Sequence, residues 1–270
     1  YSNLHTFFGK ESVDFFAFDN PLVYSDFRPP TGFHWNTNTL AITMILVLPF
    51  FLCSQKIWIK FVGGSAITVI TVFAASRAVF IGLIFILCLY LIFVKKQIGT
   101  LSLIWITVVA LFWGMQILSE SDNPRINEVA NSMEAVGLYL SGDIDIGGSL
   151  TWRRELVDNG IDLFLQSNGL GVGAGGSTVL QEKMGGVAGR FTSMHNFWVE
   201  ILVEGGLLIA VLFILWYSGL LLKLWHVAKN KKEPFVKYLS QSLFLSMLGF
   251  LPAAIAASST IYFFPMWIMF

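Results

Sequence analysis

The chain has 270 residues, of which 55% are hydrophobic and 13% are charged, and its 17 basic and 17 acidic side chains leave no formal net charge. Because a soluble globular domain has about 25% charged residues, this composition excludes a soluble enzyme, a disordered protein and a nucleic-acid-binding protein. We therefore expect an all-α, polytopic integral membrane bundle. The chain starts at Tyr1 and stops within an apolar run at Phe270, which predicts that it is the C-terminal part of a longer protein.

Stretches without charged residues mark the expected membrane spans, since a helix needs about 20 mostly apolar residues to cross a bilayer. After an extracytoplasmic segment at residues 1–39, four helices are predicted within residues 40–118, at Leu40–Ser54, Phe61–Ser76, Ala78–Val94 and Gln97–Ser119. The second and third of these stretches are separated only by the charged residue Arg77. As one helix they would measure about 51 Å against a hydrocarbon core of about 30 Å, so we expect a hairpin that turns near Ala74–Arg77.

The character of the sequence changes at residues 119–196, which are rich in Gly, Ser, Asn, Asp and Glu and hold most of the arginines. We expect a large hydrophilic loop with a helix over Thr151–Gln166, where apolar residues recur at helical spacing. Residues 197–270 are predicted to return to the membrane, with spans at Phe197–Leu222 and Tyr238–Ala256. A last span, from Ile261, is cut short by the end of the chain.

Lysine and arginine are divided between the two faces of this predicted bundle. The short loops after Leu52, Val94 and Leu222 contain nine lysines, no arginine and one acid. The N-terminal segment, the Arg77 turn and the large loop contain all six arginines, and the other sixteen acids lie on this side or at its interface. Short cytoplasmic loops carry an excess of basic residues, so the lysine-rich loops are predicted to be cytoplasmic and the large loop extracytoplasmic.

The arginines indicate that the outer face binds an anion. Arginine suits bidentate contacts with phosphate and carboxylate, whereas topology alone would leave the outer face poor in arginine. Ordinary ion pairs with the sixteen acids are the alternative. Such a pair is expected for Arg154, whose helix face it shares with Asp158 and Asp162, while Arg153 has no such neighbour. For Arg77 the alternative is a side chain that extends from the hairpin tip to the membrane interface.

Ser193-Met194-His195-Asn196 directly precedes the predicted span at Phe197. Asn196 is a suitable N-cap, and Asn196, Glu200 and Glu204 recur every four residues, which places them on one polar stripe of an apolar helix. His195 would then lie at the outer mouth of the bundle, where it could act as a general base. A histidine that only completes the helix cap is the alternative.

The glycines at Gly171-Val172-Gly173-Ala174-Gly175-Gly176 match the spacing of the dinucleotide-binding fingerprint, but no strand–helix context surrounds them. We interpret them as a tight turn that lets two backbones approach closely, with an amide nest for an anion as the alternative. The sequence has no HExxH, CxxC, GxSxG or Walker A motif, so neither a metal site nor a cofactor is predicted.

Five pieces of the chain together resemble the O-antigen ligase and polysaccharide polymerase superfamily. In chain order they are Gly32-x-x-x-Asn36-x-Asn38, Ser76-Arg77, Thr151-Trp152-Arg153-Arg154, Gly169-Leu170-Gly171-Val172-Gly173, and His195-Asn196-Phe197-Trp198-Val199-Glu200 followed by Glu204-Gly205-Gly206. The last piece is the most specific, because it is similar to the H-N-x-x-x-E…E-x-G signature of that family. The resemblance extends from about Gly32 to the C-terminus.

The resemblance implies a GT-C-like membrane glycosyltransferase that works at the outer face of the cytoplasmic membrane without a metal or a nucleotide sugar. The implied donor is a glycan on undecaprenyl diphosphate, and the implied acceptor is a hydroxyl of another glycan. Polysaccharide export or chain-length proteins are further implied partners. The implied reaction is polymerisation or ligation, and a teichuronic-acid or capsule polymerase is favoured over a lipid A core ligase.

The resemblance also assigns roles to individual residues. His195 is the implied base, and Arg77 with one of Arg153 and Arg154 would hold the donor diphosphate. Supporting residues are Arg190, as a weaker candidate for the same anion, and the polar side chains Asn36, Asn38, Asn196 and Glu200. A transporter or flippase of lipid-linked oligosaccharides is the alternative function. It is disfavoured because transporters commonly contain internal repeats with a site at the midplane, whereas here the polar groups gather at the outer face.

Overall fold

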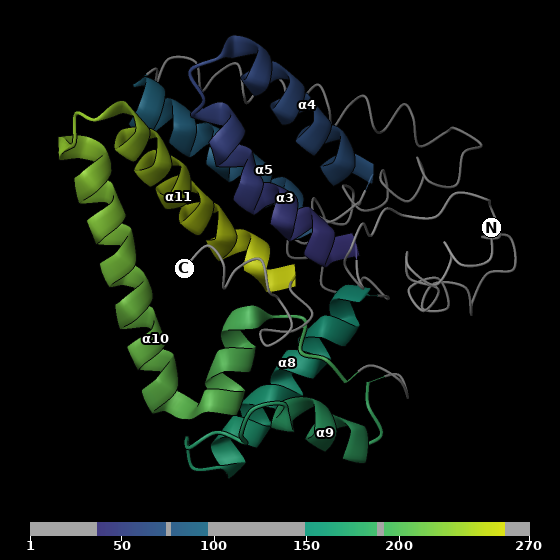
Figure 1. Cartoon of the computed structure of the whole chain (residues 1–270). Coiled ribbons are helices and arrows are strands. Elements are labelled where there is room, and N and C mark those ends of the chain that lie inside the picture. The colour runs from purple at the N-terminus through teal and green to yellow at the C-terminus, as the bar shows by residue number, and fades with distance from the viewer. Residues whose placement is uncertain (1–36, 74–76, 97–148, 188–191, 257–270) are drawn as a thin grey trace, which may run out of the picture.

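The computed structural model describes residues 37–73, 77–96, 149–187 and 192–256. Within these ranges the regular elements are all helical, and they form a bundle with a smaller helical unit at one end (Figure 1). The bundle contains α3 (Thr37–Leu52), α4 (Ile57–Phe73), α5 (Arg77–Leu89) continued by the π-helical turn η2 (Tyr90–Lys95), α10 (Phe197–Asn230), α11 (Pro234–Ala253) and η4 (Ala254–Ala256). The smaller unit contains α8 (Ser149–Gln166) and α9 (Gly176–Lys183).

Helix α11 lies at the centre of the bundle, where it packs against α3, α5 and α10. The core between these helices is apolar and includes the fully buried Ile45, Ile86, Met247 and Phe250. Small polar residues add hydrogen bonds between neighbouring helices: the Ser246 hydroxyl lies 2.6 Å from the Leu46 carbonyl oxygen on α3. Such contacts are a usual means of holding apolar helices together where water is excluded.

The helices begin near the residues that the sequence marks as caps and boundaries. Asn196 precedes α10, and its side-chain oxygen accepts hydrogen bonds from the Trp198 and Val199 amides, as an N-cap does. The helix expected over Thr151–Gln166 is α8, and the two arms expected on either side of Arg77 are α4 and α5. The stretches at Gln97–Ser119 and from Ile261 onward lie outside the described residues.

By length and composition, one helix of the described part could cross a bilayer, namely α10 with 34 residues. Shorter apolar helices cover Asn38–Leu52, Ile57–Thr71 and Ile81–Lys95. The turns between α3 and α4 and between α10 and α11, together with the end of η2, lie at the end of the bundle away from α8 and α9 (Figure 1). The described lysine-rich loops therefore share one end of the molecule.

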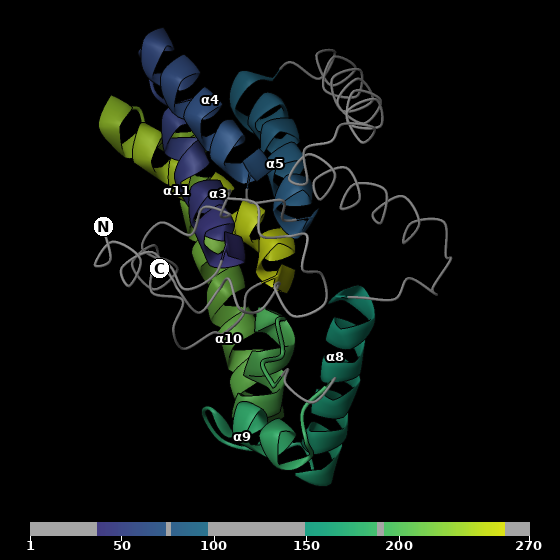
Figure 2. The same cartoon turned by 90° about the vertical axis from the view of Figure 1, so that its right-hand side faces the viewer.

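The α10 segment differs from the single inward span expected over Phe197–Leu222. It extends to Asn230, and at Gly206 its backbone leaves the helix with φ 77° and ψ 175°. We call residues 197–205 the short arm and residues 207–230 the long arm. The arms fold back on each other in a V (Figures 1 and 2), and the ring of Trp198 lies 5.7 Å from that of Tyr217. The expectation of one continuous span from Phe197 was therefore wrong, because a broken helix in this apolar run has the same composition as an unbroken one.

Candidate functional site

The break in α10 is occupied by the glycine-rich loop that joins α8 to α9. An unbroken helix would bond the Leu207 amide to the Val203 carbonyl. Instead, Val203 O accepts from the Val172 amide at 2.9 Å, and the Leu207 amide donates to Gly169 O at 2.9 Å. The Gly173 amide also donates to Glu204 O at 3.0 Å. The loop thus replaces the backbone hydrogen bonds that the break removes, which a buried backbone requires.

Glycine is needed on both sides of this crossing. A Cβ atom on Gly171 would overlap the Gly206 amide nitrogen, and one on Gly206 would overlap the Leu170 carbonyl oxygen. Both residues also have positive φ, which favours glycine. The interpretation of the glycine run as a close approach of two backbones is confirmed. In the described part of the chain this run joins two helices, so the dinucleotide-binding context is absent there.

The same loop binds a carboxylate that belongs to the protein itself. Glu204 is 8% exposed, and its Oε2 accepts from the Gly175 amide at 2.9 Å while its Oε1 accepts from the Ser177 hydroxyl at 2.5 Å. These donors lie at the N-terminus of α9, where the helix dipole also favours a negative charge. The anion bound by this part of the loop is therefore the side chain of Glu204. Its hydrogen bonds connect the end of the short arm to α9.

His195 lies at the opposite end of the short arm, in the residue before the N-cap. Its φ of 49° places it in the left-handed region, which a non-glycine residue seldom adopts and which is enriched at functional sites. Its Nδ1 atom is buried and has no hydrogen-bond partner among the described residues. Burial, and secondarily the positive charge of Arg153, lower the pKa of His195 from 6.5 to about 4. The imidazole is therefore neutral at pH 7 and able to accept a proton.

Residues of α8 and α9 contact Met194 and so stabilise the conformation of the His195 turn. Met194 is almost fully buried in a small core with Leu163 and Val203, and it packs closely against Gly160 of α8. The side-chain amide of Gln181 on α9 lies 3.4 Å from the Met194 sulfur and 3.3 Å from the Leu156 carbonyl oxygen. The histidine is thus positioned by residues of all three helices.

The two adjacent arginines of α8 have different surroundings. Arg153 is half-buried and close enough to His195 for its charge to affect the pKa of the imidazole. Arg154 points to solvent and pairs with Asp158, its Nε lying 3.9 Å from Oδ2, with both side chains about two-thirds exposed. An exposed pair of this kind contributes little. The charge of Arg153 therefore affects the histidine, whereas Arg154 is exposed and paired with Asp158.

The other predicted site residues are placed less completely. Arg77 begins α5, at the end of the bundle that faces α8, but its side chain lies outside the described part, as do Asn36 and Arg190 (Figure 2). Asn38 is half-buried in the first turn of α3 at that same end. Glu200 is 5% exposed and follows Asn196 by one helical turn, with its amide bonded to Asn196 O at 2.9 Å.

The sequence did not reveal the contact between Glu204 and the loop. The sequence predicts only that Glu204 lies on a polar stripe of an apolar helix, and its partners Gly175 and Ser177 lie 29 and 27 positions earlier in the chain. The available signal was a pair of glycines directly after an acid in an apolar run, combined with a separate glycine-rich turn. In the described residues no cluster of three or more His, Cys, Asp or Glu side chains could hold a metal ion.

Comparison with known proteins indicates the family of the chain. A family model described as O-antigen ligase matches residues 62–214, a range that includes α8, α9, His195 and the break at Gly206. The chain is also 25% identical over 247 residues to the teichuronic acid biosynthesis protein TuaE of Bacillus subtilis (strain 168), a match that covers 88% of this chain and 50% of TuaE. The chain thus spans about half the length of that relative. Since the family match covers more than half of its residues, the chain belongs to the O-antigen ligase family.

Proposed function

We propose that the protein is a multi-pass enzyme of the cytoplasmic membrane that transfers or polymerises glycans carried on undecaprenyl diphosphate, with its active site on the outer face. Membership of the O-antigen ligase family and the likeness to a teichuronic acid biosynthesis protein support polysaccharide biosynthesis at a membrane. The common location of the described lysine-rich loops, at the end away from α8 and α9, supports the orientation. The observation that carries the proposal is a neutral, buried His195 within reach of the charge of Arg153.

In the proposed reaction the imidazole of His195 takes the proton of the acceptor hydroxyl as its oxygen attacks the anomeric carbon of the donor glycan. A new glycosidic C–O bond forms, and the bond between that carbon and the diphosphate oxygen breaks. Undecaprenyl diphosphate leaves with the electron pair, and the imidazolium later returns its proton to water. Arg153 stabilises the negative charge that develops on the leaving diphosphate. Arg77 and Arg190 are proposed for the same anion, and Asn36, Asn38, Asn196 and Glu200 for support.

The comparison of the two adjacent arginines tests this assignment. In Arg153→Gln we expect transfer to fall about 10²-fold, the usual effect of removing one donor to a developing negative charge. In Arg154→Gln we expect transfer within about three-fold of wild type, because its exposed pair with Asp158 contributes little. The measurement uses purified full-length protein with a lipid-linked oligosaccharide and a glycan acceptor, in detergent and without a membrane gradient. Equal losses in the two variants would contradict the role of Arg153, and absence of any transfer by wild type would favour a transporter.

The pH dependence of transfer follows from the pKa of His195, which is lowered by burial and secondarily by the charge of Arg153. In the free protein the pKa of His195 is about 4, so kcat/KM for the donor should be flat near neutrality and fall as the pH drops through about 4. A bound diphosphate adds negative charge beside Arg153, which raises the pKa of the imidazole. The acid limb of kcat should therefore lie at higher pH than that of kcat/KM. In Arg153→Gln the acid limb of kcat/KM should also move to higher pH; identical limbs in both profiles and both proteins would contradict the model.

A further inference from the structure

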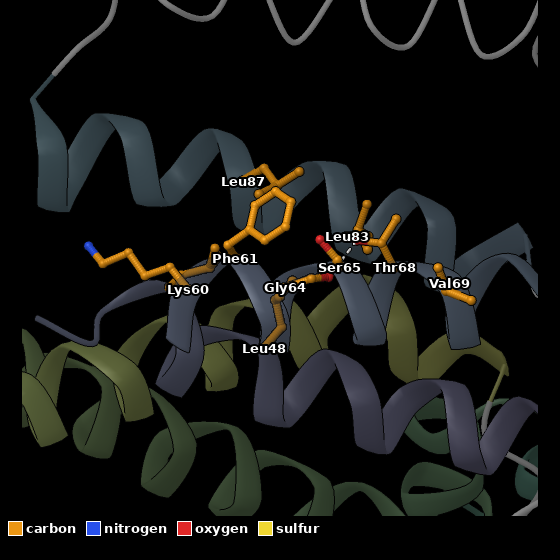
Figure 3. A pocket seen from close by; sticks show the side chains of 10 residues that line it. Leu48, Lys60, Phe61, Gly64, Ser65, Thr68, Val69, Leu83 and Leu87 are labelled. Carbon is orange, nitrogen blue, oxygen red and sulfur yellow. Dashed lines mark hydrogen bonds between the residues drawn. The ribbon is translucent and has the colours of Figure 1, made fainter. Parts of the chain in front are cut away.

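A groove on the side of the bundle is not used by the proposed reaction. It has a volume of about 460 Å³ and lies between α4 and α5, with α3 as its floor. Its walls are mostly apolar, formed by Leu48, Phe61, Leu83 and Leu87, with Lys60 at one end and Val69 at the other (Figure 3). The groove has few polar groups, and one of them already has a hydrogen-bond partner: the Thr68 hydroxyl donates to the Gly64 carbonyl at 2.9 Å. Such a groove suits an extended apolar chain.

Positive charge gathers at the Lys60 end of the groove. The Lys60 ammonium donates to the Tyr90 hydroxyl at 3.2 Å, and the charged side chain of Lys95 also lies near this hydroxyl. Two like charges that share one neutral partner repel each other. Among the described residues, no carboxylate lies within ion-pair distance of either lysine. The ion pair found in this part of the chain joins Arg154 and Asp158. An anion at this end would remove the repulsion and complete the site.

We propose that the groove binds one acidic glycerophospholipid, with an acyl chain along α4 and α5 and its phosphate between Lys60 and Lys95. The assignment rests on the membrane orientation proposed above, in which these lysines lie at the cytoplasmic surface. Basic residues there attract anionic headgroups, by about 1 kcal/mol each. A zwitterionic lipid offers the same acyl chain without net negative charge, so the two lysines select the acidic one.

The groove can be filled without disturbing the helices around it. A Cβ atom on Gly64, which lines the groove, would meet no atom within 4 Å. Gly64→Leu should therefore place its side chain in the groove where the acyl chain would lie. Gly219→Leu is the matched control, since Gly219 lies on the long arm of α10 and also has open space around its Cβ position. Lys60→Gln removes one charge and keeps a side chain that can donate to Tyr90.

The test is native mass spectrometry of full-length protein reconstituted in bilayers that contain phosphatidylglycerol and phosphatidylcholine. Wild type and Gly219→Leu should retain one phosphatidylglycerol. Lys60→Gln should retain about five-fold less of it, which corresponds to about 1 kcal/mol, and Gly64→Leu should retain neither lipid at this site. Equal retention of the two lipids, or no effect of either substitution, would overturn the proposal and would indicate another occupant, such as a protein helix.

The result can be separated from the proposed glycan transfer, because the assay contains no glycan donor or acceptor. His195→Ala should retain the phospholipid as wild type does, since His195 precedes the short arm of α10 and does not line the groove. A protein that transfers glycans but binds no acidic lipid would refute the lipid site alone. A protein that binds the lipid but transfers nothing would refute the proposed reaction alone.

Discussion

Replacement of His195 by alanine is expected to reduce glycan transfer by about 10²–10⁴-fold, the usual contribution of a general base. The physical reason is that the buried imidazole is neutral near pH 7 and is the proposed acceptor of the hydroxyl proton. Donor binding should change little, because the proposed diphosphate contacts come from arginines. The measurement is the initial rate of transfer by the purified variant, with bound donor quantified separately.

A second substitution distinguishes loss of the general base from loss of the backbone conformation of the His195 turn. His195 has a positive φ, and asparagine tolerates the left-handed region better than most residues do. His195→Asn should therefore keep the backbone of the turn and the melting temperature of wild type, yet be as inactive as His195→Ala. If His195→Asn transferred glycans at the wild-type rate, the residue would be a cap and not a base.

Gly206→Ala is expected to destabilise the protein by about 2–6 kcal/mol, the sum of a conformational and a steric cost. With φ 77° and ψ 175°, Gly206 occupies a region that is essentially restricted to glycine, which costs another residue about 1–3 kcal/mol. The new methyl group would also overlap the Leu170 carbonyl oxygen, a backbone atom that cannot move without breaking the loop contacts. Thermal unfolding in detergent should show a large fall in Tm, with transfer activity lost as well.

Gly219→Ala provides the control for this prediction. Gly219 lies within the long arm, and a Cβ there meets no atom within 4 Å. Alanine in a helix interior is more favourable than glycine by roughly 0.5–1 kcal/mol, so this variant should be slightly more stable than wild type. Similar Tm values for Gly206→Ala and Gly219→Ala would show that the break in α10 does not depend on its glycine.

Local signals in the sequence predicted the helical elements well. Asn196 fixes the start of α10 by a local side-chain bond, and the recurring apolar residues of Thr151–Gln166 indicate α8. Neither signal depends on distant parts of the chain. The candidate residues His195 and Arg153 were also recognisable, because their types and order suffice to suggest a base and an anion ligand. Their roles remain proposals.

The features that the sequence did not reveal depend on contacts between distant segments. The V shape of α10 requires that Gly169, Val172 and Gly173 supply the hydrogen bonds missing at Gly206, and no pattern within Phe197–Leu222 contains that information. The choice between Arg153 and Arg154 depends on which side of α8 faces the His195 turn. Adjacent positions on a helix differ by about 100° in direction, so a one-residue difference decides which arginine is near the imidazole.

The short arm of α10 is capped at one end by Asn196, beside His195, and is bound to α9 at the other end through Glu204. It therefore acts as a rigid spacer of about two and a half turns. Its residue count sets both the separation and the relative rotation of its two ends. An insertion of one residue would leave every side chain type in place but turn the carboxylate away from Ser177. For this reason the number of residues between the histidine and the glutamate is as much a part of the site as the side chains themselves.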